Sequence, residues 1–440
     1  MNQRAWRVCY SWIACPIGWM GGQLLAWTNQ TLKGSLQGRK GLWQRLDAQL
    51  VHRDQNKAFI WFHVASAGEF LQAQPVLERC LQHGFECAVT FASVNGYTWI
   101  QPTTFSPERR PVVIDYLPLD FAWNMRRIIK KLQPAVIVYV NYDLWPNFVW
   151  EAHAAGIPQY LISAAIQPRS KRFTSSVARS FYRTVYACLD GIFTVTDQDR
   201  QRFLATNPEH PNIQTVGDTR FDSVIARKRK LSPPKLPKYI EKKRVIIIGS
   251  SSPADDVHIF PPLKEALQRY PDVFLIIVPH EPVEEYLQNS ETFFQDFPSE
   301  RFTRLQEHPR HVPRILLVDT VGVLSSLYAV GTLAYVGGGF HPRVHNVMEP
   351  CVMGLPVIFG PIYDNSPEAI DLLQRGFAFS INNSAEFRTK LFEFLDNPEK
   401  CEQLGTQAQQ VIESQAGVAD RCFELITATI RRKKNDGQIS

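Results

Sequence analysis

Short apolar runs alternate with amphipathic stretches along this chain, and this rhythm constrains the fold more than any other feature. It begins at Ala58, and helical patterns such as Phe121–Leu132 separate the apolar runs. The first series of predicted strands is Ala58–Val64, Glu86–Phe91, Val112–Asp115, Ala135–Val140, Gln159–Ser163, Gly191–Val195 and Ile213–Val216. Continuous apolar strands that alternate with helices predict a parallel sheet covered on both faces.

A second series follows after an interruption. Its predicted strands are Val245–Gly249, Val273–Val278, Ile315–Val318, Thr332–Val336 and Val357–Phe359. The predicted helices among them are Asp255–Arg269, Val321–Ala329, Asn346–Met353 and Pro367–Arg375. The chain has 440 residues, which suits two domains. We therefore expect an α/β fold of two doubly wound Rossmann-like domains, with ligands bound at the carboxyl ends of the strands in a cleft between them.

The expected domain boundaries follow from these two series. We assign 46–225 to the first domain, 226–243 to a linker, 244–430 to the second domain and 431–440 to a polar tail. The segment from Ala226 to Arg244 combines dense basic charge with Pro233, Pro234 and Pro237, so we expect no regular element there. Its alternative role is a basic patch that faces anionic lipid.

Residues 1–45 precede the first domain and are predicted to form a membrane-associated helix with a basic flank. The stretch from Val8 to Trp27 contains no charged residue, and twenty helical residues measure about 30 Å. Pro16 and three glycines weaken the helix, so both a marginal span and a helix in the bilayer interface remain open. More basic residues follow the segment than precede it, which predicts a cytoplasmic body. A cleaved signal peptide is the alternative, although no convincing cleavage site follows the apolar run.

The overall composition excludes several classes of protein. The eight cysteines are scattered without a CxxC pair, which is typical of reduced thiols in a core and indicates neither disulfides nor a zinc site. The formal net charge of +6 is a mild excess. It favours an anionic partner such as a sugar nucleotide or a lipid headgroup, and it does not indicate binding to nucleic acid.

Two short motifs at predicted strand ends carry acidic side chains. The first is HVASAGE, in which Ser66 and Gly68 allow a sharp turn and Glu69 could accept a proton from a sugar hydroxyl. Alternatively, Glu69 is a favourable acid in the first turn of a helix. The second is NYDLWPN, from Asn141 to Asn147, in which Asp143 either contacts substrate or caps a helix.

The third motif is the most specific. In YVGGGFHPRVHNVMEP a strand enters Gly337, Gly338 and Gly339, and a basic loop then leads to a helix start. Glycines allow close approach of the backbone, and the amides of a helix start bind phosphate. Glu349 could accept hydrogen bonds from ribose hydroxyls. The motif is neither a Walker A loop nor GxGxxG, and a purely structural glycine turn is its alternative.

Four further loops share a position just after predicted strands. They are GDTRFD with Arg220, GSSS with Ser250 and Ser251, PHEP with Pro279 and His280, and the loop from Gly360 through Asn365 to Glu368. Taken singly, each of these loops has an ordinary loop sequence and indicates no function. Their common position makes them a constellation at one sheet edge.

In this order the motifs resemble those of the 3-deoxy-D-manno-octulosonic acid (Kdo) transferase family, from about Gly38 to Phe423. ASAGE, YDLWPN, GDTRFD and GGGF…HNVMEP followed by GLPVIFGP are similar to the family's signatures. The resemblance implies a GT-B glycosyltransferase of the bacterial inner membrane, on its cytoplasmic face. It would move Kdo from CMP-Kdo to a lipid A precursor in lipopolysaccharide core biosynthesis, without a metal or other cofactor.

The resemblance also implies roles for individual residues. Glu69 would be the catalytic base in an inverting displacement, with acceptor-side or supporting roles for Ser66, Gly68, Asn141, Asp143 and Arg169. The implied nucleotide-sugar site comprises Arg220, Ser250, Ser251, Pro279, His280, Gly337, Gly338, Gly339, His345, Asn346, Glu349, Asn365 and Glu368.

The chain departs from the family pattern at several positions. Asn141 stands where an acid is common, so a second carboxylate is missing there, and Ala165 and His280 stand where arginine is usual. Arg220 replaces lysine, which keeps the charge but not the geometry. Two alternatives therefore stay open: a UDP-sugar transferase or epimerase on the same scaffold, and a non-catalytic, membrane-associated nucleotide-sugar binder.

Overall fold

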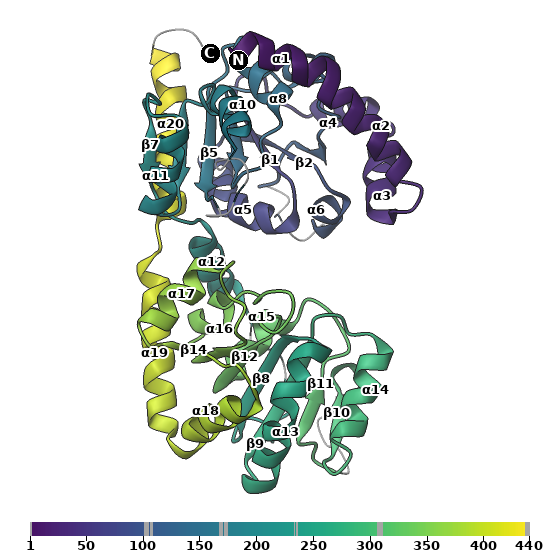
Figure 1. Ribbon diagram of the computed structural model, residues 1–440, viewed down its shortest axis with the longest axis vertical. Coiled ribbons are helices and arrows are strands. Elements are labelled where there is room, and N and C mark those ends of the chain that lie inside the picture. Colours follow the sequence, from purple (N-terminus) through teal and green to yellow (C-terminus); the bar gives the residue numbers. More distant parts are fainter. Residues whose placement is uncertain are drawn as a thin grey trace. The chain divides into compact units, whose positions relative to one another are not determined.

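The computed structural model describes residues 2–100, 105, 109–166, 170, 175–232, 234, 236–305 and 311–435. The chain divides into two compact units (Figure 1). The first comprises Met1–Ser223 together with Gly417–Ser440, and the second comprises Val224–Ala416.

The first unit is built on a seven-stranded sheet with the order β3-β2-β1-β4-β5-β6-β7, and its strand pairs are parallel. The strands are β1 (Phe59–Val64), β2 (Glu86–Phe91), β3 (Val113–Tyr116), β4 (Val136–Val140), β5 (Gln159–Ala164), β6 (Gly191–Thr194) and β7 (Ile213–Thr215). All seven were expected from the sequence. The strand order reverses between β1 and β4, which makes their carboxyl ends the topological switch point.

Both faces of this sheet are buried, as the continuous apolar strands predict. Phe59 and Trp61 of β1 join a core cluster with residues of α4 (Leu42–Leu50), α7 (Ala122–Leu132) and α8 (Pro146–Ala154). Ile60, Phe62 and Val64 point the other way, into a cluster with α5 (Ala67–Gln82). This alternation follows from the two-residue period of a strand.

The last helix, α20 (Val418–Asn435), belongs to the first unit, whereas the sequence boundaries place residues up to 430 in the second domain. Its apolar side chains Val418, Cys422 and Phe423 are buried in the same cluster as α5. Asp222 fixes the helix start by accepting hydrogen bonds from the backbone N–H groups of Gly417 (2.7 Å) and Ala419 (3.0 Å). The expected boundary is therefore wrong at this end, because the apolar face of α20 packs in the core of the first unit.

The remaining helices of the first unit connect its strands. They are α6 (Val94–Trp99), α10 (Ser176–Tyr186) and α11 (Asp197–Thr206), and α12 (Arg220–Lys230) runs on into the second unit. The expectation of an irregular segment from Ala226 is wrong for its first residues. Val224 and Ile225 are buried and anchor α12, and the four basic residues of its last turn suit the negative end of a helix dipole.

The second unit repeats the same topology in a sheet ordered β10-β11-β9-β8-β12-β13-β14, again with parallel pairs. Its strands are β8 (Arg244–Ser251), β9 (Val273–Pro279), β10 (Ser299–Arg301), β11 (Ile315–Leu317), β12 (Leu333–Val336), β13 (Val357–Phe359) and β14 (Ala378–Ser380). The two edge strands β10 and β14 were not expected, because neither Ser299–Arg301 nor Ala378–Ser380 is a continuous apolar run. The switch point lies between β8 and β12.

The helices of the second unit cover its sheet. They are α13 (Pro253–Arg269), α14 (Glu284–Phe293), α15 (Leu324–Leu327), α16 (Met348–Val352), α17 (Pro367–Gln374), α18 (Ser384–Asp396) and α19 (Pro398–Ser414). Two of them are shorter than expected. The predicted helix 346–353 is α16 alone, and the predicted helix 321–329 is α15 followed by a 3₁₀ turn, Tyr328–Val330.

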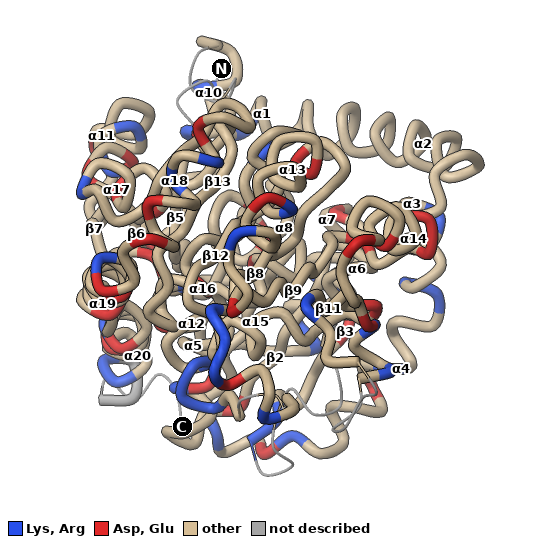
Figure 2. Tube along the Cα trace, turned by 90° about the horizontal axis from the view of Figure 1, so that it is seen from below, with Lys and Arg blue, Asp and Glu red and all other residues tan. Residues whose placement is uncertain are grey.

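The N-terminal stretch is helical, as expected. Helices α1 (Gln3–Cys9) and α2 (Cys15–Leu25) are joined through a π-helical turn, Tyr10–Ala14, and α3 (Gln30–Gly38) follows. Figure 2 shows that α2 carries neither acidic nor basic residues. Within the described parts of the chain, no helix has both the length and the apolar character needed to cross a membrane.

Candidate active site

Glu69 lies at the carboxyl end of β1, where the chain turns into α5. Ser66 is the N-cap of α5, and its hydroxyl accepts a hydrogen bond from the Glu69 N–H (3.4 Å). The carboxylate of Glu69 folds back and accepts a hydrogen bond from the Ala65 N–H. Glu69 therefore does stabilise the helix start, but its side chain is also buried at the switch point, so the two interpretations of this residue are compatible.

The pKa of Glu69 is raised to about 8. Burial is the main cause, because it disfavours the charged form, and the negative charge of Asp143 adds to it. Hydrogen bonds from the backbone amides of Ala65 and Ser66 oppose the shift. A carboxylate with a pKa near the working pH is suited to general-base catalysis.

Asp143 follows β4, the strand beside β1. Its carboxylate accepts a hydrogen bond from the indole N–H of Trp145 (3.1 Å). The same oxygen lies 3.3 Å from Nε2 of His63, but the two are not aligned as a hydrogen bond. His63 is otherwise held through Nδ1 by the carbonyl and hydroxyl of Thr90 (3.1 and 3.0 Å). The structure thus adds His63 to the site, a residue that its burial inside a strand gave no reason to select.

The alternative role of Asp143 as a helix cap is wrong. The N-terminus of α8 is held instead by Asp120, which accepts hydrogen bonds from the backbone N–H groups of Asn147 (3.1 Å) and Phe148 (2.9 Å). Asp120 comes from the loop before α7, far away in sequence. Asp143 is left partly exposed at the sheet edge, where it is available to a substrate.

Asn141 is the first residue after β4 and has a left-handed backbone, with φ of 61°. Its N–H donates to the carbonyl of Ile162 (2.9 Å). Its side-chain oxygen is buried and has no hydrogen-bond partner among the described residues. Such an acceptor at the end of a strand is suited to a hydroxyl group of a ligand.

Glu69, Asn141 and Asp143 are therefore brought to the carboxyl ends of two adjacent strands, as the sequence predicts. Gly68 is exposed, and a side chain there would meet only Ser66 Oγ, at 3.8 Å, so packing does not require a glycine. Arg169 lies outside the described residues.

Arg220 lies at the same edge, after β7. Its guanidinium Nε donates to Asp218 (2.7 Å), which also accepts a hydrogen bond from Gln72 of α5 (3.2 Å). The Thr219 hydroxyl donates to the carbonyl of Gln72 (2.6 Å). The loop that carries Arg220 is thus fastened to the helix that carries Glu69, a connection that the sequence did not reveal.

In the second unit the three glycines form a tight turn after β12. A Cβ atom on Gly337 would lie 2.3 Å from the carbonyl oxygen of Ser250, and one on Gly338 would lie 2.3 Å from that of Arg343. Gly338 also has a φ of +84°, which favours glycine. Local packing therefore accounts for these glycines, and it brings the turn against the last residues of β8.

Asp255 holds this turn in place and was missed in the sequence. It is fully buried in the first turn of α13, and it accepts hydrogen bonds from the Gly338 N–H (2.9 Å) and the Tyr335 hydroxyl (2.9 Å). The backbone N–H and hydroxyl of Ser252 donate to it as well (3.0 and 2.7 Å). The S-x-x-D pattern before an apolar helix was the available signal.

The loop from His345 to Glu349 is held by its own side chains. Asn346 accepts a hydrogen bond from the Met348 N–H (3.0 Å) and donates to Glu349 (3.3 Å). Glu349 also pairs with Arg227 of α12. Because α16 has only five residues and Asn346 already occupies one of its first amides, the predicted phosphate site at this helix start is weaker than expected.

Two further predicted residues, Asn365 and Glu368, lie nearby. Asn365 donates to the carbonyl of Val344 (3.2 Å), while its own oxygen is buried without a partner in the described part of the chain. Glu368 is buried in the first turn of α17. Residues that follow β11 lie at the same edge. Tyr328 and Leu324 are so close to Gly249, near the end of β8, that a Cβ atom on this glycine would contact both side chains.

His280 follows Pro279, the last residue of β9, and stacks on His345 with ring centroids 4.4 Å apart. Its N–H donates to the carbonyl of Ser251 (2.9 Å). Burial and the nearby His280 lower the pKa of His345. Ser250 has a left-handed φ of 54°, which turns the chain sharply beside the glycine turn.

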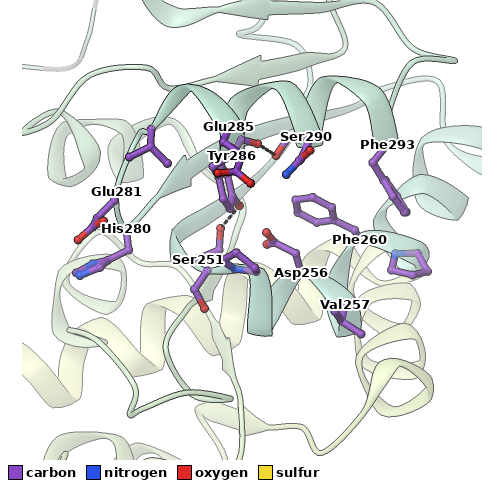
Figure 3. Close-up of a pocket in the computed structure, with 15 residues that line it drawn as sticks. Ser251, Asp256, Val257, Phe260, His280, Glu281, Glu285, Tyr286, Ser290 and Phe293 are labelled. Carbon is purple, nitrogen blue, oxygen red and sulfur yellow. Dashed lines mark hydrogen bonds between the residues drawn. The ribbon is translucent and has the colours of Figure 1, made fainter.

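A cavity of about 650 Å³ opens between α13 and α14 next to these residues (Figure 3). Its walls include Val257, Phe260 and Phe293, and the carboxyl group of Asp256 points into it (Figure 3). The hydroxyls of Ser251 and Tyr286 meet at 2.9 Å beside that carboxyl group. Burial raises the pKa of Asp256 to about 7, with a smaller contribution from the charge of Asp255. Among the residues described, no cluster of His, Cys, Asp or Glu is arranged to hold a metal ion.

Comparison with known proteins agrees with this arrangement. A family model described as 3-deoxy-D-manno-octulosonic-acid transferase (kdotransferase) matches residues 38–223. The enzyme of that name from Chlamydia pneumoniae is 28% identical over 90% of this chain and 91% of its own length. The one from Haemophilus influenzae is 24% identical over 85% and 87%. The chain is therefore similar to Kdo transferases over most of its length.

Members of the Kdo transferase family are glycosyltransferases, so this protein is an enzyme of that class. Solved structures with the same fold include the UDP-GlcNAc 2-epimerase of Neisseria meningitidis, with a TM-score of 0.57 and 14% identity over 86% of this chain and all of its own. MurG of Acinetobacter baumannii has a TM-score of 0.52 and 13% identity over 84% and 99%. These similarities establish the GT-B fold, and at this identity they say nothing about the substrate.

Proposed function

We propose that this enzyme transfers Kdo from CMP-Kdo to a lipid A precursor, with inversion at the anomeric carbon, in lipopolysaccharide core biosynthesis. We place the reaction at the cytoplasmic face of the bacterial inner membrane. The observation that carries the proposal is Glu69, a buried carboxylate with a pKa of about 8 at the switch point of the first unit, in a chain similar to Kdo transferases.

In the proposed reaction Glu69 accepts the proton of the acceptor hydroxyl as its oxygen attacks the anomeric carbon of Kdo. The bond from that carbon to the phosphate oxygen of CMP breaks, and CMP leaves with the bonding electron pair. A single displacement of this kind inverts the configuration. The proton then passes from Glu69 to solvent. The unpartnered oxygen of Asn141 is placed to accept a hydrogen bond from a substrate hydroxyl.

We assign the CMP phosphate to the turn of the second unit at Gly337–Gly339. The glycines let this turn pack directly against the backbone of Ser250, Arg343 and Gly360, which fixes its place at the strand ends. Asp255 accepts the Gly338 N–H and the carbonyl of Gly249 accepts the Gly337 N–H, so the shape of the turn is fixed before the substrate binds. Departing negative charge is best stabilised by such fixed dipoles.

The decisive experiment incubates the purified full chain, in lipid vesicles, with CMP-Kdo and a lipid A precursor. We expect a product heavier by Kdo and one CMP released for each Kdo transferred. Glu69→Gln should reduce turnover by roughly 10²–10⁴-fold, because the amide cannot take up a proton. Glu78→Gln on the same helix is the matched control and should retain turnover.

Three results would overturn this function. Full turnover by Glu69→Gln would remove the base assignment. Tighter binding of UDP than of CMP would favour a UDP-sugar enzyme on the same scaffold. Saturable binding of CMP without any turnover in the wild-type protein would instead indicate a non-catalytic binder.

A further inference from the structure

One cavity of the second unit has no part in the proposed reaction. It is the space of about 650 Å³ between α13 and α14 (Figure 3), whereas the CMP phosphate is assigned to the turn Gly337–Gly339. Sites for small molecules measure about 300–1,000 Å³. The cavity is therefore large enough for a ligand of its own, and the side chains around it indicate the class of that ligand.

The walls of the cavity are largely apolar. Val257 and Phe260 reach it from α13, and Phe293 reaches it from the last position of α14. Val257 is 70% and Phe293 is 37% exposed, so both keep apolar surface open to a ligand. The rings of Phe260 and Phe293 meet with their centroids 5.4 Å apart. A ligand with an apolar or aromatic body would bury this surface, and the burial stabilises the complex in proportion to the area covered.

The polar end of the cavity is the carboxyl group of Asp256, which points into it (Figure 3). Its Oδ1 is buried and has no hydrogen-bond partner among the residues that the structure describes. The neighbouring hydroxyls of Ser251 and Tyr286 bond to each other (2.9 Å). Buried carboxyl oxygens are normally hydrogen-bonded, because an unpaired one has lost its hydration without compensation. The carboxyl group therefore keeps acceptor capacity that the protein leaves unused, and a ligand in the cavity could supply the donor.

The charged side chains that line the cavity are acidic. Glu281 and Glu285 line it together with Asp256, and both glutamates are exposed. No lysine or arginine is among the lining residues, and the basic side chain among them, His280, stacks on His345. Acidic groups around an apolar cavity attract a positive charge and repel a negative one.

Two charged groups lie just outside these walls. Lys264 approaches the ring of Phe293, with its Nζ 5.4 Å from the centroid, but it is already paired with Asp296 (2.6 Å). Asp255 is buried next to Asp256 in α13 and adds negative charge. The cavity is therefore acidic in a chain whose formal net charge is +6, and this contrast favours a cationic ligand.

We propose that this cavity binds an organic ammonium compound, with its charged nitrogen at Asp256 and its apolar body against Phe260 and Phe293. Hydrogen bonds from an ammonium group to a carboxylate are among the stronger ones in proteins. Aromatic rings add to the attraction, because the face of each ring is negative. This ligand is neither the sugar donor nor the lipid acceptor, so the site goes beyond the proposed function and does not rest on it.

The test titrates the purified full chain with three probes that share an aromatic body and differ in charge: 2-phenylethylamine, 2-phenylethanol and 3-phenylpropionate. Calorimetry at pH 8 should show saturable binding of the amine with a Kd of about 1 mM or tighter. The alcohol should bind at least about tenfold more weakly, and the carboxylate should not bind. Ethylamine, which keeps the charge without the aromatic body, should also lose at least about tenfold. Equal affinity for the amine and the alcohol, or binding of the carboxylate, would overturn the ligand class, and no saturation by the amine at about ten times that concentration would overturn the site.

Two variants locate the ligand in the cavity. Asp256→Asn should lower the affinity for 2-phenylethylamine at least about tenfold, whereas Asp319→Asn, the same change at a partly exposed site of this unit, should not. Val257→Lys places a competing cation at the wall and should lower the affinity to a similar extent. Its matched control is Val177→Lys, at an exposed position on α10 of the first unit, which should bind like the wild type. Unchanged affinity in either cavity variant would overturn the placement.

The pH dependence of binding tests the role of the carboxyl group. Burial raises the pKa of Asp256 to about 7, so the affinity for 2-phenylethylamine should rise between about pH 6 and pH 8 as this group ionises. The rise should be smaller in Asp256→Asn, and an equal rise in both proteins would overturn the contact. None of these measurements uses CMP-Kdo or turnover, so the site and the proposed function are tested separately.

Discussion

The carboxylate of Asp143 raises the pKa of Glu69, second only to the effect of burial. The two residues follow adjacent parallel strands, so the sheet itself brings the two negative charges to one edge. The charge of Asp143 disfavours the ionised form of Glu69, and the buried Glu69 carboxylate holds its proton up to about pH 8. The arrangement gives a stronger base than an exposed glutamate, at the cost of a smaller ionised fraction near neutrality.

This relationship predicts a shift in the pH profile of Asp143→Asn. In the wild type, kcat/KM should rise with pH until Glu69 is ionised near pH 8, because only the ionised carboxylate accepts a proton. Removal of the neighbouring charge lowers the pKa of Glu69, so the variant should reach its plateau at lower pH. The measurement is kcat/KM for CMP-Kdo, with the lipid acceptor at saturating concentration, across about pH 6 to 9. An unchanged midpoint would show that Asp143 does not act on the base.

Much of this architecture could be predicted because it depends on local pattern. Every strand of the first sheet and the placement of Glu69 and Asn141 at strand ends follow from apolar runs and the rule for parallel sheets. Asp120 and Asp255 could not be found in this way. Each acts on amides distant in sequence, on α8 and on Gly338, and a one-dimensional pattern does not show such pairings. For the same reason the sequence boundaries placed α20 in the second domain, although it packs in the core of the first unit.

The glycine turn gives a second prediction. Gly338→Ala would place a methyl group 2.3 Å from the carbonyl of Arg343 in a left-handed conformation, so the turn must move. We expect CMP affinity to fall by more than about tenfold, as calorimetry would measure. Gly376→Ala is the matched control, since its φ of +77° imposes similar strain but no atom lies within 4 Å. It should cost about 1 kcal/mol of stability and leave CMP affinity unchanged. Equal CMP affinity in both variants would contradict the assignment of phosphate to this turn.

Asp255 gives a third prediction because one carboxylate serves four donors. In Asp255→Asn the new NH₂ group faces donors, so at least one of them loses its acceptor. We expect a loss of roughly 2–4 kcal/mol in the stability of the second unit, and weaker binding of CMP as the Gly338 amide is released. Tyr335→Phe removes a single donor and should cost about 1 kcal/mol without loss of CMP affinity. Denaturant unfolding and CMP titration of the two variants separate these outcomes, and normal CMP binding by Asp255→Asn would contradict the positioning role.

The last prediction concerns Asp256, whose pKa is raised by burial to about 7 from an ordinary value of 3.8. A folded-state pKa above the unfolded one means that the folded protein binds the proton more tightly, so this group destabilises the fold progressively as pH rises from about 4 to about 7. Asp256→Asn keeps the size of the side chain and removes the titration. Its stability relative to the wild type should therefore increase between about pH 5 and pH 8, by at most roughly 3 kcal/mol. Thermal unfolding at the two pH values measures the difference. Asp319→Asn, at a partly exposed site where the pKa is lowered, is the control: its stability relative to the wild type should stay constant over this range, because Asp319 is ionised in the folded and the unfolded state above about pH 5. If the difference in the free energy of unfolding between the wild type and Asp256→Asn does not change with pH, the carboxyl group in the cavity ionises as it does in water.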